Sequence, residues 1–312
     1  MTEMMWLYIP LFIAGLVCLV KGSDFVTTHA SAIAKASGIS PLVVGMTIVA
    51  VSTSLPELAV SLISVFFRTS DIATGTIIGS NIANICLIVG LSALLYPVKT
   101  KSSFIKEGFF TLLFTLLIVV FLLDGMIYTE GIVILAGFFV YMYYLISEKR
   151  KGEIKKRTAS GKRRTKKIIK HIFFSVAGGF VVVVGAEVVI HSTINIADVM
   201  GVSEMLIALI AIAVGTSLPE LAVSFTAAWK KMGGISLGNI LGSNIFNIAI
   251  LAMVSLFSSV PVKPFTIFVN LPIMLISTAL LMLFIRTGWE ISRTEGGILI
   301  MIYLLFLISQ FI

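Results

Sequence analysis

The sequence has little charge, little cysteine and little histidine. Only 12% of its 312 residues are charged, about half the share in a typical soluble domain, whereas 58% are hydrophobic and the mean hydropathy is +1.09. These values exclude an ordinary soluble protein. Two cysteines, Cys18 and Cys86, are too few for a disulfide framework, and we expect both to be small packing residues. The sequence has no Cys–His cluster, so zinc and copper are disfavoured as bound metals.

Long apolar runs fill most of the chain. Runs such as Phe109–Leu123 and Ile127–Ile146, each extended by its neighbours, reach the roughly 20 residues that a helix needs to cross a bilayer. The sequence therefore predicts an all-α membrane protein with ten transmembrane helices. We expect these spans at roughly 6–34, 41–67, 72–97, 104–123, 127–147, 171–200, 205–229, 234–259, 264–285 and 295–312. The first and sixth spans are long, so we expect them to be tilted.

One segment is strongly polar. Lys149–Lys170 holds twelve Lys or Arg residues and accounts for most of the net charge of +8. Basic loops stay on the cytoplasmic side. We therefore expect the 148–170 loop on the cytoplasmic side of the cell membrane and, with ten spans, both termini outside the cell. We also expect segment 149–170 to contact anionic lipid. Nucleic-acid binding is the weaker alternative for this segment.

A nine-residue stretch occurs twice. TSLPELAVS begins at Thr53 and again at Thr216, and the same offset relates GSNIAN (Gly79–Asn84) to GSNIFN (Gly242–Asn247). A constant offset over five spans predicts a duplicated five-helix unit, and an odd number of spans inverts the second copy. We therefore expect a first repeat at 1–147, a basic cytoplasmic loop at 148–170 and a second repeat at 171–312, functional as a monomer.

Each copy of the stretch carries a carboxylate beside a proline. Glu57 and Glu220 have no basic neighbour in the sequence, and an unpaired charge at the bilayer centre costs about 2.5–3.5 kcal/mol. Pro56 and Pro219 interrupt the helical hydrogen bonding and release backbone oxygens. We therefore expect broken helices 2, 3, 7 and 8 around an ion site at the midplane. The structural alternative is a helix kink in which neighbouring hydroxyls cap each glutamate.

Polar side chains that share these faces complete a set of hard oxygen ligands. Thr53 and Ser54 lie four and three residues before Glu57, on one helical face, and the second copy repeats this spacing. Oxygen ligands of this kind suit Ca²⁺, and uncharged hydroxyls and carbonyls suit Na⁺. The candidate metal ligands from side chains are Glu57, Glu220, Thr53, Thr216, Ser54, Ser217, Ser80, Ser243, Asn84 and Asn247.

These motifs resemble the alpha-repeats of the cation/calcium exchanger superfamily, most of all its prokaryotic sodium/calcium exchangers. GMTIVAVSTSLPE with GTIIGSNIAN resembles the first repeat, and ALIAIAVGTSLPE with GNILGSNIFN resembles the second. The resemblance covers essentially the whole chain, because the ten-span layout and the basic central loop agree as well. Some prokaryotic relatives carry an aspartate where this chain has Asn247, so the site has one negative charge fewer in this chain.

The resemblance also implies a role for each ligand. Glu57 and Glu220 would be the central Ca²⁺ carboxylates, helped by the backbone carbonyls of Thr53 and Thr216. The flanking Na⁺ ligands would be Ser54, Ser80, Ser217 and Ser243, with the carbonyls of Ala50 and Ala213. Asn84 and Asn247 would line the middle of the site.

Together these features predict a secondary active antiporter that exchanges Na⁺ for Ca²⁺ by alternating access, with Ca²⁺ and Na⁺ as substrates and no cofactor. A Ca²⁺/H⁺ antiporter on the same fold and a passive cation channel are the alternatives. We expect no enzyme, because the sequence has no HExxH motif or Ser–His constellation.

The predicted spans contain other polar residues whose roles are less specific. Asp24 and Glu187 occupy matching positions in the first and sixth spans, where they either face the ion path or pack between helices. His29, His171 and His191 do not follow the offset, and we expect them to be interfacial rather than proton carriers.

Overall fold

The computed structural model is almost entirely helical and describes residues 2–66, 70–151, 161–200 and 216–310. The first half contains α1 (Thr2–Ser37), α2 (Pro41–Val44), η1 (Gly45–Val49), α3 (Ala50–Thr53), α4 (Leu55–Phe66), α5 (Ser70–Ile82), η2 (Ala83–Val89), α6 (Gly90–Leu95), β1 (Val98–Lys99), α7 (Ser102–Leu122) and α8 (Tyr128–Lys151). The second half contains α9 (Gly161–Val199), α11 (Leu218–Trp229), α12 (Gly233–Ser255), η4 (Thr266–Asn270), α13 (Leu271–Arg286), β2 (Glu290–Ile291) and α14 (Arg293–Ser309).

The described residues include seven helices that are long and apolar enough to cross a membrane. A bent pair, Pro41–Thr53 with Leu55–Leu62, raises this number to as many as eight. Two of the ten predicted spans are not among them. Helix α14 has only 17 residues, and much of the predicted span at 205–229 precedes α11, in residues 201–215, outside the described part. The chain is thus a multi-pass helical membrane protein, and the full count of ten stays a prediction.

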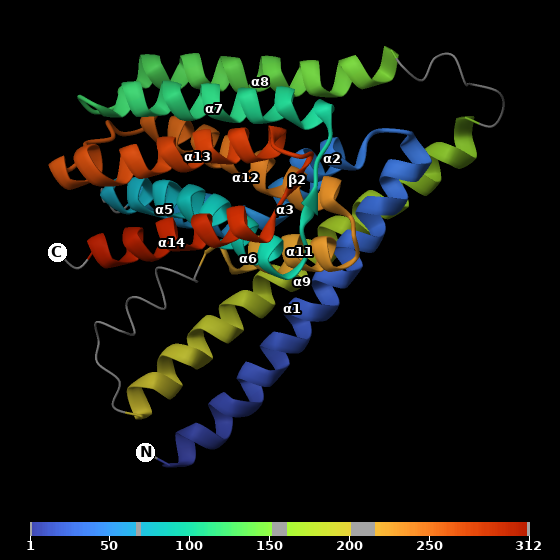
Figure 1. The fold of residues 1–312 in the computed structure, drawn as a ribbon. Coiled ribbons are helices and arrows are strands. Elements are labelled where there is room, and N and C mark those ends of the chain that lie inside the picture. The colour runs from blue at the N-terminus through green and yellow to red at the C-terminus, as the bar shows by residue number, and fades with distance from the viewer. Residues whose placement is uncertain (1, 67–69, 152–160, 201–215, 311–312) are drawn as a thin grey trace.

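The two longest described helices form a pair of their own. Helices α1 and α9, of 36 and 39 residues, run antiparallel and cross the remaining bundle obliquely, as Figure 1 shows. Glycines permit their close approach: a Cβ atom on Gly15 would lie 3.0 Å from the carbonyl oxygen of Gly185, and a Cβ on Gly185 would lie 3.0 Å from that of Gly15. The sequence predicted these two spans as long, and the structure joins them along their length.

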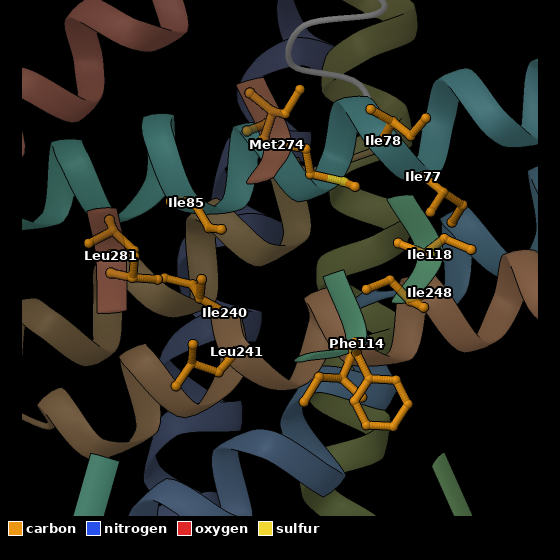
Figure 2. Close-up of a cluster of buried hydrophobic side chains, with 14 of the residues drawn as sticks. Ile77, Ile78, Ile85, Phe114, Ile118, Ile240, Leu241, Ile248, Met274 and Leu281 are labelled. Atoms are coloured by element: carbon orange, nitrogen blue, oxygen red, sulfur yellow. The ribbon is translucent and has the colours of Figure 1, made fainter. Parts of the chain in front are cut away.

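Helix α12 forms the centre of the remaining bundle. It contacts α5, α7, α8 and α11. Within its most apolar 18-residue stretch, 89% of the residues are buried inside the protein. Figure 2 shows apolar side chains of this core, among them Ile248 of α12 itself, Ile77 of α5, Ile118 of α7 and Met274 of α13. Because α12 is buried on all sides, the polar residues that it carries are removed from lipid and water alike.

The prediction of a broken eighth helix is wrong. Helix α12 is continuous from Gly233 to Ser255. The segment contains no proline, so every residue keeps the N–H that forms the i→i−4 hydrogen bond. The third predicted span also continues without a sharp bend from Ile72 to Leu95, and a π-helical stretch, η2, replaces the expected break. Only the second predicted span has a sharp break within the described residues.

Two short backbone pairings at opposite ends of α7 link the halves of the chain. At the end where α7 begins, β1 pairs antiparallel with β2, which places Val98 opposite Ile291 and Lys99 opposite Glu290. Beyond the other end of α7, Met126 and Val260 form an isolated antiparallel bridge. The sequence did not predict these pairings. The β1–β2 pairing fixes the loops before α7 and α14 to each other, and the bridge fixes the segment after α7 to the segment after α12.

Candidate cation site

The second span breaks at the residues that the repeat singled out. Helix α3 ends at Thr53, and Ser54 leaves the helical region with φ −86° and ψ 19°. Helix α4 begins at Leu55 after a bend of 46°. Pro56 follows at once, where its missing N–H falls in the unpaired first turn of the new helix. The predicted break is therefore confirmed in the first copy.

Both glutamates begin a helix at the centre of the protein. Glu57 lies in the first turn of α4 and Glu220 in the first turn of α11, and both side chains are 0% exposed. The N-terminal turn of a helix carries unpaired N–H groups and partial positive charge, which favours a carboxylate there. The N-terminal turns of α4 and α11 thus supply part of the stabilisation that a buried carboxylate needs. The predicted break of the seventh span depends on residues 201–215, which lie outside the described part, so it stays a prediction.

Hydroxyl groups connect the two glutamates across the halves of the chain. Ser54 Oγ donates to Glu220 Oε1 at 2.8 Å, and Ser80 Oγ donates to Glu57 Oε1 at 3.2 Å. The Ser80 and Thr216 hydroxyl oxygens lie 3.0 Å apart. The carboxylates of Glu57 and Glu220 are close enough to repel each other electrostatically. The structure therefore brings both acids into one cluster, as the sequence predicted.

Four asparagines from α5, η2 and α12 form a second polar layer. Asn84 Nδ2 donates to Asn244 Oδ1 at 3.0 Å, and Asn247 Nδ2 donates to Asn81 Oδ1 at 3.1 Å. Asn81 and Asn244 also donate to each other's backbone carbonyl at 3.4 Å. All four side chains are at most 1% exposed. These bonds hold the two carboxamides of Asn84 and Asn247 by their nitrogen ends and leave their oxygens for another partner.

A further hydrogen-bonded chain supports the break from behind. Thr53 Oγ1 donates to Asn239 Oδ1 at 3.1 Å, and Asn239 Nδ2 donates to Ser224 Oγ at 2.9 Å. This chain joins α3, α12 and α11 through fully buried side chains. It fixes the position of Thr53, the last residue before the break, relative to α11, whose first turn carries Glu220.

Four side-chain oxygens in this cluster, two from carboxylates and two from carboxamides, have no hydrogen-bond partner among the described residues. They are Glu57 Oε2, Glu220 Oε2, Asn84 Oδ1 and Asn247 Oδ1, each with less than 1 Å² of exposed surface. A buried oxygen without a partner is unusual, and a buried unpaired carboxylate is more costly still. All four are hard oxygen donors, of the kind that Ca²⁺ binds. In the described part of the chain, no group of three or more His, Cys, Asp or Glu residues suggests a softer metal site.

The other predicted ligands vary in their placement. Ser217 precedes α11 as its N-cap residue and is buried, and Ser243 is buried in α12. The carbonyl oxygen of Ala50 accepts hydrogen bonds from Ser54 N at 3.0 Å and Thr53 Oγ1 at 3.2 Å, so it is engaged within its own helix. Ala213 lies outside the described residues.

Sequence reasoning missed three asparagines of the cluster: Asn81, Asn239 and Asn244. Asn81 and Asn244 lie within the repeated GSN segments, so the fixed offset could have identified them. Asn239 had no such signal, because the first copy carries Thr76 at the equivalent position.

Asp24 and Glu187 lie away from this cluster. Asp24 is 58% exposed and forms an ion pair with Lys230 at 2.6 Å, and Lys230 Nζ also donates to Thr27 Oγ1 at 3.0 Å. Asp24 thus belongs to the contact between α1 and the end of α11, which was one of the two alternatives. Glu187 is exposed on α9. The rings of His29 and His171 lie 5.1 Å apart between α1 and α9.

Fold and site together define the class: this is a multi-pass helical membrane protein whose centre gathers two carboxylates, five carboxamides and several hydroxyls. Comparison with known proteins then gives the family. The family model described as "Sodium/calcium exchanger protein" matches residues 7–147 and 170–312. The chain belongs to the sodium/calcium exchanger family.

Similar proteins agree over nearly the full length. The chain is 36% identical to "Sodium/calcium exchanger MaX1" of Methanosarcina acetivorans, over 96% of this chain and 97% of that protein. It is 34% identical to "Putative antiporter CaxA" of Alkalimonas amylolytica, over 94% of this chain and 95% of that protein. A solved structure of the sodium-calcium exchanger NCX_Mj matches with a TM-score of 0.85 and 31% identity, over 98% of this chain and 99% of the other.

Proposed function

We propose that this protein is a secondary active antiporter that exchanges Na⁺ for Ca²⁺ across the membrane by alternating access. The observation that carries the proposal is the set of four buried oxygens without partners, two from carboxylates and two from carboxamides. Membership of the sodium/calcium exchanger family and the likeness to NCX_Mj support the same function. Nothing in this function requires enzyme chemistry.

Each ligand has a role in this proposal. The carboxylates of Glu57 and Glu220 bind Ca²⁺ at the centre, with Thr53 and Thr216 beside them. The unpartnered oxygens of Asn84 and Asn247 face the same ion or a water on it. The flanking Na⁺ ligands are the hydroxyls of Ser54, Ser217, Ser80 and Ser243 with the carbonyls of Ala50 and Ala213. Ala50 can take part only after its carbonyl is released from Ser54 N and Thr53 Oγ1.

Coupling follows from the charge of the cluster. Two carboxylates buried together repel each other and resist burial unless a cation compensates them. One Ca²⁺, or Na⁺ ions in its place, compensates this charge, so the loaded site can be occluded from both sides of the membrane. Because the two ions compete for overlapping oxygens, only one kind is bound at a time. This competition makes exchange, rather than leak, the expected activity.

We further infer that the chain is an inverted repeat of two five-helix halves, 1–147 and 171–312, joined by the 148–170 loop. Reciprocal contacts between equivalent residues support this arrangement. Asn81 and Asn244, which are 163 positions apart, donate to each other's carbonyl, and Asn84 and Asn247 donate to each other's neighbours. Exchanging the halves maps each bond onto its partner, as expected for a two-fold pseudo-axis in the membrane plane.

The membrane arrangement completes the proposal. With ten spans, the 148–170 loop lies on the cytoplasmic side of the cell membrane and both termini lie outside. The basic residues of segment 149–170 contact anionic lipid, and the protein functions as a monomer. Antibody or protease access to tags in this loop, in sealed cells and in inverted vesicles, tests the orientation.

Ion-gradient-driven Ca²⁺ uptake into proteoliposomes tests the function, with Na⁺, K⁺ and H⁺ gradients imposed separately. We expect an outward Na⁺ gradient to drive Ca²⁺ uptake, and Glu57→Gln or Glu220→Gln to abolish it. Glu187→Gln removes the same charge from an exposed position on α9 and should keep the activity. Uptake driven by a pH jump and not by Na⁺ would favour a Ca²⁺/H⁺ antiporter. Ca²⁺ movement that runs only down the Ca²⁺ gradient, whatever the Na⁺ gradient, would favour a passive channel.

A further inference from the structure

A cavity of about 490 Å³ lies apart from the cation cluster, beside the β1–β2 pairing. Its wall combines the segment between α6 and β1, the turn between α11 and α12, and β2. The residues that matter are Tyr96, Lys99, Lys231, Gly233 and Glu290. All of these segments lie at the end of the bundle where α7, α12 and α14 begin. None of the proposed cation ligands lines the cavity.

Two lysines give the cavity its charge. Lys99 and Lys231 are both exposed, and neither forms an ion pair among the described residues, in contrast to the adjacent Lys230. One carboxylate, Glu290, lies opposite Lys99 in the β1–β2 pairing, so the wall keeps a net positive charge. Helix α12 begins at Gly233 with no side-chain cap, and the positive end of its helix dipole adds to the positive potential.

The backbone holds Lys231 in an unusual conformation. Its φ is +58°, at the end of α11, where its N–H donates to Ala228 O at 2.8 Å. Glycine is the usual residue at such a helix end, because a side chain in the left-handed region costs about 1 kcal/mol or more. A lysine at this position is therefore a strained choice, and strain of this kind is found where a side chain has a binding role.

Aromatic residues at the cavity are of the kind that gathers at the depth of lipid headgroups. Tyr96 lines it and packs edge-to-face on Trp229 with ring centroids 5.1 Å apart, and Trp229 is 58% exposed. Tryptophan and tyrosine gather at the membrane–water boundary, where phospholipid phosphates also lie. Lysine ammonium groups at this level are the usual partners of anionic headgroups.

From these observations we propose that the cavity binds a phosphoryl anion through Lys99 and Lys231. The phosphate belongs either to the headgroup of an anionic phospholipid or to a soluble phosphate ester. The turn that carries Lys231 also carries Lys230, which holds α1 through Asp24, and it connects α11 with α12. An occupied cavity therefore fixes the junction between α1 and the two helices that carry Glu220 and Asn244. This influence on ion exchange rests on the proposed function, whereas the binding itself does not.

Binding is tested on the purified full-length protein in neutral detergent, without Na⁺ or Ca²⁺ gradients. Short-chain phosphatidylglycerol is titrated in one arm, and glycerol phosphate and inorganic phosphate are titrated in the other, with binding followed by calorimetry. We expect Lys99→Gln with Lys231→Gln to weaken binding about thirtyfold, because each lysine near a membrane surface contributes about a factor of five. Lys35→Gln, an exposed lysine outside the cavity, should change the affinity less than threefold.

The two arms separate the sources of the phosphate. Lysine-dependent binding of the lipid alone supports a headgroup site, and equal binding of glycerol phosphate supports a soluble ester. Affinity of the double variant within threefold of the parent protein, or an equal loss in Lys35→Gln, would overturn the proposal. Unchanged thermal unfolding of the double variant without ligand verifies that it is folded. Because the titration uses no ion flux, its result stands whether or not Na⁺/Ca²⁺ exchange is observed.

Discussion

Replacing Gly242 with alanine tests a close backbone-to-backbone helix contact beside the cation cluster. Gly242 lies in α12, one residue before Ser243, and faces the backbone of Met46 in η1. A Cβ atom at position 242 would lie 2.5 Å from both the Cα and the carbonyl oxygen of Met46. Non-bonded carbon atoms normally stay about 3.5–4.0 Å apart, so η1 and α12 must separate by about 1 Å.

The size of the effect follows from this geometry. Overpacking of a well-packed core costs about 1–3 kcal/mol, and the upper end applies because backbone atoms cannot rotate away. Alanine regains about 0.5–1 kcal/mol as the better helix former. We therefore expect a net destabilisation of about 2 kcal/mol. The displacement also reaches the cluster, because η1 leads directly into α3, whose last residue, Thr53, donates to Asn239 of α12.

Thermal unfolding in detergent and Na⁺-driven Ca²⁺ flux in proteoliposomes measure the two consequences. Gly242→Ala should melt several degrees lower than the parent protein and lose most of its flux. Gly297→Ala is the matched control on α14, because a Cβ atom there would meet no described atom within 4 Å apart from the backbone of its own helix. The control should melt at the parent temperature or slightly above it. Equal melting temperatures and fluxes for both variants would refute the close packing of η1 against α12.

Three further substitutions test contacts away from the cluster, each by thermal unfolding in detergent. Lys230→Met removes the ion pair with Asp24, and because both groups are partly exposed we expect a loss of at most about 1 kcal/mol. Tyr141→Phe removes the 2.7 Å hydrogen bond to Glu107 Oε2 between buried side chains, and we expect a loss of about 1–3 kcal/mol. Ser292→Ala destroys the capping box of α14, and we expect a loss of about 0.5–2 kcal/mol.

Matched controls make the same chemical change at exposed positions: Lys35→Met, Tyr128→Phe and Ser103→Ala. Each control should melt within about 1 °C of the parent protein, since surface changes of this kind contribute little. If Tyr141→Phe melts no lower than Tyr128→Phe, the buried bond to Glu107 does not contribute to stability. The same comparison applies to the lysine and serine pairs.

The sequence identified the acids of the site for a physical reason. A carboxylate in an apolar run is so costly that Glu57 and Glu220 were expected to share a function, and the structure brings them together. Helical spacing was a poorer guide to their partners. Ser54 lies three residues before Glu57, yet it donates to Glu220, because the helix breaks at Ser54 itself and its side chain leaves the face that Glu57 follows.

The predicted break in the eighth span is absent from the structure. Proline interrupts helical hydrogen bonding, and α12 has none, so its backbone hydrogen bonds continue through the polar residues. Its asparagines are stabilised by other side chains instead, for example by the bonds that join Asn244 to Asn81 and Asn84. Such partners come from the other half of the chain, and spacing within one helix cannot predict them.

The amino-acid sequence was enough to identify a multi-pass membrane protein, the place where its second span breaks, and the acids and hydroxyls that lie among apolar residues. Composition, proline and local periodicity are sufficient for these conclusions, because they depend on neighbours along the chain. The folded structure was needed to see that Ser54 bonds to Glu220, that Asn81 pairs with Asn244, and that four carboxylate and carboxamide oxygens have no partner among the described residues. These features depend on contacts between residues more than a hundred positions apart, which form only when the two halves pack against each other.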